Sequence, residues 1–180
     1  MIVVIAGTNR PDSNTLKVAR LVENTLRGCG EDVSLLDLSR LPPELFAPSS
    51  YAAKPKSFQP FQDMVLAAAG IVTVVPEYNG SFPGVLKYFI DMLQFPESLV
   101  GKPAAFVGLS SGRWGAVRAV EQLEMVFQYR HAHLYGRRVF LPNIASLVDE
   151  QGRLSKPVIS DRLEAAMRDF AVFCHRVRGS

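Results

Sequence analysis

The chain opens with an apolar run, residues 2–6 (IVVIA), followed by a polar loop, residues 7–15 (GTNRPDSNT). The run has no polar residue on either face, which is typical of a central strand of a parallel sheet that is buried on both sides. Ser13 or Asn14 is placed to cap a helix, because both side chains accept hydrogen bonds from backbone N–H groups. The stretch therefore predicts a strand, a loop and a helix in direct succession.

The loop in residues 7–15 has the chemistry of an anion site. It offers a guanidinium, hydroxyls and side-chain amides beside the positive end of the predicted helix. It lacks the G-x-G-x-x-G spacing and the G-K-[ST] ending of nucleotide loops, so it favours a terminal monophosphate over a bridging pyrophosphate. We predict a phosphate site at Thr8, Arg10, Ser13, Asn14 and Thr15. The alternative is that these residues only cap the helix and that the guanidinium is a solvated surface charge.

The rest of the chain alternates between strand and helix patterns. Further strands are predicted over residues 32–38, 71–75, 103–109 and 138–142, and helices over residues 14–27, 61–69, 83–93, 116–130 and 160–176. This alternation predicts an α/β fold, a three-layer doubly wound five-stranded parallel sheet. Ligands of such sheets bind beyond the carboxyl ends of the strands. Residues 39–60 are rich in proline, and we expect a long irregular connection that covers a site or a partner.

Length and composition set limits on the class of protein. The 180 residues fit a single domain, residues 1–180, with an ordinary apolar fraction of 48%. The net charge of +3 is scattered along the chain, which argues against nucleic acid as a partner and slightly favours anionic small molecules. The longest apolar stretch is too short to cross a bilayer, so we expect no membrane association. Cys29 and Cys174 have no metal or redox spacing, as in a reduced cytoplasmic protein.

A second polar loop, residues 76–81 (PEYNGS), follows the most β-branched run of the chain. The Asn79–Gly80 pair favours positive φ, which turns backbone N–H groups outward. Such a loop can hold the edge of a flat heteroaromatic ring. The predicted contacts of this loop are Pro76, Glu77, Tyr78, Asn79 and Gly80. The alternative is an ordinary turn in which Tyr78 packs against the protein.

A third polar loop, residues 110–115 (SSGRWG), follows the strand predicted over residues 103–109. Its small residues let the backbone approach a ligand closely, so we predict contacts from Ser110, Ser111 and Gly112. Arg113 and Trp114 are placed near the ring or a second substrate. The alternative is that Trp114 anchors a turn to the core.

Metal and hydrolytic chemistry find no support in the sequence. His131 and His133 are two residues apart, and no third metal ligand accompanies them. No Ser-His-Asp order, no H-E-x-x-H and no paired loop carboxylates are present. We therefore predict no metal site and assign no catalytic side chain.

Taken together, three motifs resemble the NADPH-dependent FMN reductase family, whose flavodoxin-like members include quinone, chromate and azo-dye reductases. The motifs are G-T-x-R-x-x-S-N-T after the first strand, P-E-Y-N-G-S-x-P-G-x-L-K-x-x-I-D after the third, and S-S-G-x-x-G-x-x-R-A after the fourth. The likeness runs from residue 1 to about residue 141. The P-E-Y-N-G-S segment is its most specific part.

The resemblance implies a non-covalent FMN, with its phosphate in the first loop and its ring between the second and third loops. It implies NADPH or NADH as the electron donor and a small molecule (a flavin, quinone, azo compound or metal oxyanion) as the acceptor. It also implies a homodimer or homotetramer, with the helices after Pro83 and Gly115 as candidate contacts.

Three functions fit this resemblance: an NAD(P)H-dependent reductase, an FMN-binding electron carrier, and a regulatory flavoprotein without turnover. Carriers are usually strongly acidic, and a pI near 9.0 argues against that function. Arg113 and Trp114 stand where the family is often richer in glycine, which leaves the regulatory function open.

Overall fold

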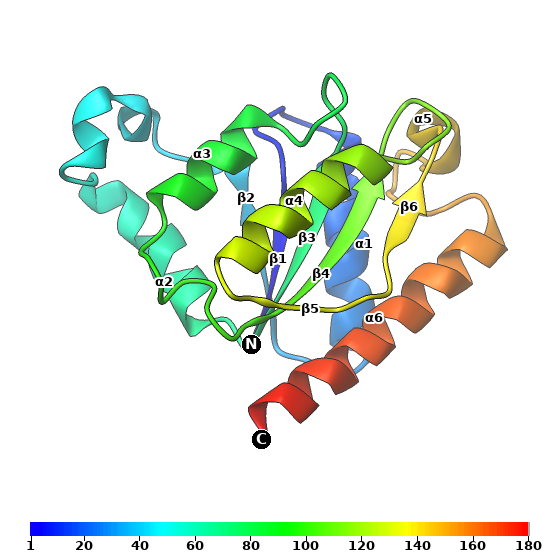
Figure 1. Cartoon of the computed structure of the whole chain (residues 1–180). Helices are drawn as coiled ribbons and strands as arrows, with labels where there is room; N and C mark the ends of the chain where they lie inside the picture. Colours follow the sequence, from blue (N-terminus) through cyan, green and yellow to red (C-terminus); the bar gives the residue numbers. More distant parts are fainter. Residues whose placement is uncertain (180) are drawn as a thin grey trace.

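The computed structural model describes residues 1–179 and is built around one parallel sheet (Figure 1). Its strands are β1 (Ile2–Ala6), β2 (Val33–Asp37), β3 (Gly70–Pro76), β4 (Pro103–Leu109), β5 (His133–Leu134) and β6 (Val139–Leu141). Its α-helices are α1 (Asn14–Gly28), α2 (Gln59–Ala67), α3 (Gly84–Met92), α4 (Val117–Tyr129), α5 (Ile144–Leu147) and α6 (Pro157–Arg178).

The strand order confirms the predicted doubly wound sheet. The strands follow one another as β2-β1-β3-β4, and both β5 and β6 pair with β4. The fifth position is thus occupied by two short strands rather than one. The sequence prediction located β6 and missed β5, because two residues are too few to produce a recognisable alternation.

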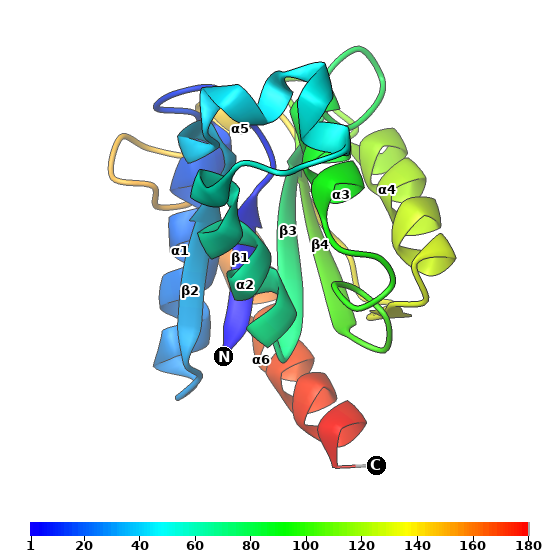
Figure 2. The ribbon, with the colours of Figure 1, turned by 90° about the vertical axis from the view of Figure 1, so that its left-hand side faces the viewer.

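Helices cover both faces of the sheet and form two apolar cores (Figure 2). Successive side chains of a strand point to opposite faces, so Val4 packs in the core beneath α1 and α6, while Val3 and Ile5 pack in the core beneath α2, α3 and α4. Every residue of β1 is buried, as predicted for a central strand.

The connection between β2 and α2 is more ordered than predicted. It contains four short 3₁₀ helices, at Leu38–Arg40, Pro43–Phe46, Pro48–Tyr51 and Lys56–Phe58. The Tyr88 hydroxyl on α3 donates to the Leu45 carbonyl (2.7 Å), and the Phe46 ring stacks on the Tyr88 ring. The prolines interrupt any apolar periodicity in this segment, so its sequence predicts an irregular connection. They do not prevent short 3₁₀ turns.

The last helix, α6, begins at Pro157, three residues before its predicted start. Proline suits the first turn of a helix, since the N–H it lacks has no acceptor there. The prediction started the helix at the first regular apolar spacing and so missed this residue.

The sheet brings β1 and β3 together as neighbours, although their crossover connections leave toward different sides. A parallel sheet opens a crevice at such a point, beyond the carboxyl ends of its strands. Gly7 leads the chain out of β1 here, and a Cβ on it would lie 2.7 Å from the Val74 carbonyl oxygen. The first loop can therefore follow β3 this closely only because residue 7 has no side chain.

Candidate functional site

A pocket of about 370 Å³ lies at the carboxyl ends of β1, β3 and β4. Its volume falls within the range of about 300–1,000 Å³ found for small-molecule sites. All three predicted loops contribute to it, which confirms that the sheet gathers them. The residues lining it are Arg10, Pro11, Asp12, Ser13, Asn14, Thr15, Pro76, Glu77, Tyr78, Leu109, Ser110, Ser111 and Ile144.

The first wall of the pocket is the N-terminus of α1. Ser13 is the capping residue, and its hydroxyl accepts a hydrogen bond from the Leu16 N–H (3.2 Å). The N–H groups of Asn14 and Thr15 belong to the first turn and have no acceptor within the helix. The first turn also contains no acidic residue, so the positive end of the helix is not neutralised by its own side chains. The exposed side chain of Arg10 adds a full positive charge to this wall.

Thr8, a predicted phosphate contact, lies behind the pocket rather than on its surface. Its side chain is buried and does not line the pocket. Its hydroxyl lies 2.9 Å from the Tyr78 hydroxyl and accepts a hydrogen bond from the Arg10 N–H. Thr8 therefore ties the first loop to the second, because the chain leaving β1 turns this side chain toward β3.

The second wall is formed by Pro76, Glu77 and Tyr78, at the end of β3. The Glu77 N–H donates to the Leu109 carbonyl (3.1 Å), which joins this wall to the end of β4. Tyr78 and Ser81 exchange two backbone hydrogen bonds and close a tight turn. These bonds fix the shape of the turn that begins at Tyr78.

Asn79 and Gly80 form the tip of this turn and do not line the pocket. Their φ angles are 53° and 77°, the positive values expected of an Asn–Gly pair in a two-residue turn. The predicted conformation is thus confirmed, while the predicted contact with the pocket is not found.

The carboxylate of Glu77 is the most unusual polar group of the site. Its Oε2 atom is buried and has no hydrogen-bond partner among the described residues. The Oε1 atom lies 3.8 Å from an Nη of Arg118 on α4. A buried carboxylate oxygen normally accepts a hydrogen bond, so this atom is an acceptor that an N–H or O–H group could still occupy.

The third wall consists of Leu109, Ser110 and Ser111, at the end of β4. Gly112, a predicted cofactor contact, is not among the residues that line the pocket. The Gly112 carbonyl instead accepts hydrogen bonds from the Asn143 N–H (3.1 Å) and the Ser110 hydroxyl (2.9 Å). The loop thereby folds back on the chain after β6, which takes Gly112 away from the pocket.

Trp114 is 57% exposed, so it does not anchor the turn in the core. The Arg113 guanidinium lies 4.9 Å from the centre of its ring. Neither residue lines the pocket. Their predicted position near a ring or a second substrate therefore has no support from the pocket's lining.

Sequence reasoning missed four lining residues: Pro11, Asp12, Leu109 and Ile144. Ile144 begins α5 directly after β6, at the same edge of the sheet as the three loops. The rule that ligands bind at the carboxyl ends of strands applies to the fifth strand too, and it would have identified this residue. Asp12 adopts a φ of 49°, in the left-handed region. The sequence around Asp12 does not predict this conformation.

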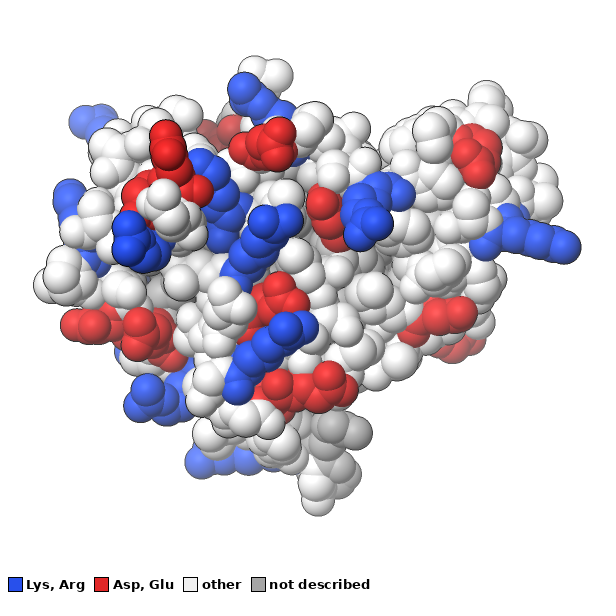
Figure 3. Space-filling view, turned by 180° about the vertical axis from the view of Figure 1, so that it is seen from behind, with Lys and Arg blue, Asp and Glu red and all other residues white. Residues whose placement is uncertain are grey.

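Other sequence predictions concern the molecule outside the pocket. Within residues 1–179, no group of three or more histidine, cysteine or acidic side chains is placed to hold a metal ion. In the same residues, no helix has the length and apolar character needed to cross a bilayer. On the side that Figure 1 turns away, basic and acidic side chains are interspersed (Figure 3). The cytoplasmic location and the lack of a nucleic-acid partner stay predictions.

The strand order and the position of the pocket define a class, the flavodoxin-like proteins. Solved structures agree with this: a flavoenzyme NAD(P)H:acceptor oxidoreductase of Paracoccus denitrificans superposes with a TM-score of 0.80 at 24% identity, covering 97% of each chain. A flavodoxin from the domain Archaea superposes with a TM-score of 0.65 at 15% identity, covering 97% of each chain. These likenesses show the fold.

Within that class, the model of the NADPH-dependent FMN reductase family matches residues 1–146, and the chain belongs to this family of oxidoreductases. An NAD(P)H-dependent FMN reductase of Pseudomonas aeruginosa is 30% identical over 83% of this chain and 82% of its own length. A quinone reductase of Pseudomonas putida is 31% identical over 86% of this chain and 84% of its own length. An NADPH azoreductase of a Bacillus species is 27% identical over 89% of this chain and 86% of its own length.

Proposed function

We propose that the pocket of about 370 Å³ is the FMN site of an NAD(P)H-dependent reductase. The observation that carries the proposal is the N-terminus of α1, which has no acidic residue in its first turn and faces a pocket at the switch point between β1 and β3. A helix N-terminus with a nearby guanidinium suits a phosphate dianion. The proposed phosphate ligands are the backbone and side chains of Ser13, Asn14 and Thr15, together with Arg10.

The remaining walls fit the ring of FMN. An isoalloxazine offers an N–H group beside carbonyl oxygens, and the buried Glu77 Oε2 is an acceptor without a partner among residues 1–179. Tyr78 forms the adjacent surface, and its hydroxyl is held by Thr8. Ser110 and Ser111 bound the pocket on the side of β4. The residues present therefore fit the cofactor that the family implies.

FMN held by these residues would supply the hydride chemistry between NADPH or NADH and a small acceptor. The chain's own residues bind and orient the cofactor. The N-terminus of α1 and Arg10 neutralise the phosphate, and Glu77 and Tyr78 fix the ring. We assign no side chain a proton-transfer role, because hydride transfer requires none.

The acceptor is proposed to be a small molecule. Relatives of this chain carry the names FMN reductase, azoreductase and quinone reductase, which share reduction of small conjugated compounds. For this chain we propose a flavin, a quinone, an azo compound or a metal oxyanion as the acceptor.

The decisive experiment is an anaerobic visible spectrum of the purified protein after incubation with FMN, before and after addition of NADPH. A flavin spectrum that bleaches supports the reductase. A bound flavin that stays oxidised with both NADPH and NADH contradicts it and favours a carrier or a regulatory flavoprotein. Bleaching followed by recovery on addition of a quinone identifies the class of acceptor.

A homo-oligomer is also proposed, with α3 and α4 as its contact. A groove of about 650 Å³ runs between these helices, and Phe95, Met125 and Tyr129 expose 59%, 68% and 74% of their surface there. Apolar side chains gathered around a groove favour association. We expect Met125→Lys to lower the mass measured by sedimentation, while Val158→Lys, at an exposed position on α6, leaves it unchanged. An unchanged mass for Met125→Lys contradicts this contact.

A further inference from the structure

One side chain of α4 holds the turn that follows β3. The Gln122 amide donates to the Gly80 carbonyl (Nε2···O 3.2 Å) and accepts from the Ser81 hydroxyl (Oγ···Oε1 2.6 Å). A single amide thus contacts two consecutive residues of the turn, using its donor on one and its acceptor on the other. A glutamine is long enough to do this and carries both functions.

The turn needs an external tie, because its own contacts fix only its two ends. Tyr78 and Ser81 pair with each other through the backbone, while Asn79 and Gly80 occupy the left-handed region at the tip. On the side of the pocket, the Tyr78 hydroxyl is tied to Thr8. On the opposite side, the Gln122 side chain connects the turn to α4.

The helix that carries Gln122 is itself firmly placed. Ala119, Val120 and Leu123 are fully buried in the core beneath α4. The backbone of Gln122 is therefore fixed relative to β3 and β4, although its side chain is exposed. Arg118, one turn earlier, reaches only to 3.8 Å from Glu77 and is itself 61% exposed, which makes it the weaker contact.

We propose that Gln122 is a positioning residue of the cofactor site: it holds the turn of residues 78–81 and thereby fixes Glu77 and Tyr78 against the pocket. This inference rests on the proposed FMN site. Gln122 does not line the pocket, so the turn is its link to bound FMN, and it also lines the groove between α3 and α4. Its loss would free the wall to move and would change the environment of the ring in its oxidised and reduced states unequally.

The test compares Gln122→Met with Gln128→Met in the full-length protein. Methionine keeps the approximate length and removes both hydrogen bonds, and Gln128 is an exposed glutamine on the same helix. FMN affinity is measured by quenching of flavin fluorescence, and the midpoint potential of the bound FMN by equilibration with a reference dye. We expect Gln122→Met to bind FMN about three- to tenfold more weakly, the effect of losing ordinary hydrogen bonds. We also expect a shifted midpoint potential, with Gln128→Met like the wild type in both.

A double-variant cycle with Ser81→Ala tests the mechanism. The Ser81 hydroxyl contacts Gln122, so Ser81→Ala should weaken FMN binding in the wild type and have no further effect in Gln122→Met. Additive losses would overturn the proposal, and so would an equal loss in Gln128→Met. Thermal unfolding of the apo-proteins verifies that each variant is folded.

The outcomes separate the two proposals. Tight FMN binding by the wild type together with unchanged affinity and potential in Gln122→Met overturns the role of Gln122 alone. A wild-type protein that binds no FMN overturns the proposed function, and the role of Gln122 with it.

Discussion

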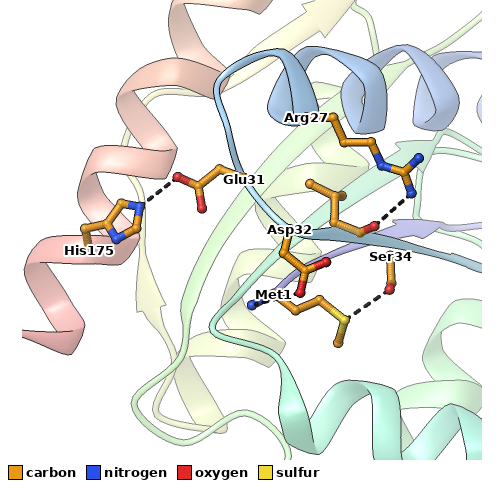
Figure 4. Close-up of polar contacts among 7 residues, drawn as sticks. Met1, Arg27, Glu31, Asp32, Ser34 and His175 are labelled. Atoms are coloured by element: carbon orange, nitrogen blue, oxygen red, sulfur yellow. Dashed lines mark hydrogen bonds and ion pairs between the residues drawn. The ribbon is translucent and has the colours of Figure 1, made fainter.

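The polar groups at the two ends of the sheet differ in their partners. At the amino end, polar groups pair with one another (Figure 4). The Arg27 guanidinium donates to the Val33 carbonyl (3.0 Å), and His175 on α6 contacts Glu31 (2.7 Å). At the carboxyl end, the first turn of α1 and the Glu77 Oε2 atom lack such partners within the described chain. The contacts at the amino end contribute to stability, and at the carboxyl end we propose that the unpartnered groups bind a ligand.

Lys102 shows the same behaviour at the amino end of β4. Its ammonium donates to the carbonyls of Leu66 and Ala68, both at 2.8 Å. These carbonyls lie at the C-terminus of α2, where helices leave acceptors without partners. Lys102 thus provides donors for the last carbonyls of α2, so this part of the amino end is also satisfied within the protein. The comparison predicts that substitutions at the carboxyl end of the sheet change the affinity for FMN. Substitutions at the amino end should change the free energy of unfolding.

The largest effect is expected for Arg10→Ala, which tests the carboxyl end. It should weaken FMN binding about 10- to 100-fold, because a charge-assisted contact to phosphate is lost. The unfolding midpoint of the apo-protein should stay unchanged, since Arg10 is exposed. The matched control is Arg27→Ala, at the amino end, which should lower stability and keep the affinity. Equal FMN affinity in Arg10→Ala and wild type would remove the first loop from the site.

Gly7→Ala, at the carboxyl end, should lower both the stability of the protein and its affinity for FMN. The added Cβ would lie 2.7 Å from the Val74 carbonyl oxygen and 3.1 Å from Leu86 Cδ2. We expect a loss of about 1–3 kcal/mol of unfolding free energy, typical of overpacking, together with weaker FMN binding. Gly28→Ala is the control, because no atom outside its own helix lies within 4 Å of its added Cβ. Urea unfolding and FMN titration of both variants measure the two effects. Wild-type stability in Gly7→Ala would contradict the close approach of residue 7 to the Val74 carbonyl.

Lys102→Met should cost about 1–2 kcal/mol of unfolding free energy at neutral pH, because two helix carbonyls lose their donor. Exposed Lys54 provides the control substitution, Lys54→Met. FMN affinity should not change in either variant. A weaker FMN affinity in Lys102→Met would show that the two ends are coupled.

The pH dependence of Lys102 has a defined sign. Burial lowers the pKa of the Lys102 ammonium, so the unfolded chain holds this proton to a higher pH than the folded chain does. The unfolding free energy therefore gains a contribution that rises with pH, between the lowered pKa and the ordinary lysine value of about 10.4. Urea unfolding across this alkaline range should show that rise in the wild type relative to Lys102→Met. An identical pH dependence of the two proteins would contradict it.

The smallest effect is expected for Glu31→Gln, which weakens the contact to His175. The histidine is 65% exposed, and exposed ion pairs contribute about 0.2–1 kcal/mol. Urea unfolding of Glu31→Gln, His175→Gln and the double variant isolates the pair. A coupling well above this range would mean that α6 depends on this contact at the amino end.

Much of this molecule follows from short stretches of sequence. The β-branched run before Pro76 forms a strand, and Ser13 caps α1, because strand propensity and helix capping depend on residues adjacent in the chain. The positive φ of Asn79 and Gly80 is equally local. The alternation of strands and helices then determined the class of fold, and with it the edge of the sheet at which three loops meet.

The tertiary structure alone decided which loop residues face the pocket. Thr8, Asn79, Gly80 and Gly112, which are predicted cofactor contacts, are not among the residues lining the pocket, whereas Ile144 is. Each of these outcomes depends on partners distant in the chain, as in the contacts of Thr8 with Tyr78 and of Gln122 with Gly80. Local propensities decide which helices and strands form. The direction of a loop side chain depends instead on how those elements pack against one another. That packing involves residues distant in the chain, so no single segment of sequence predicts it.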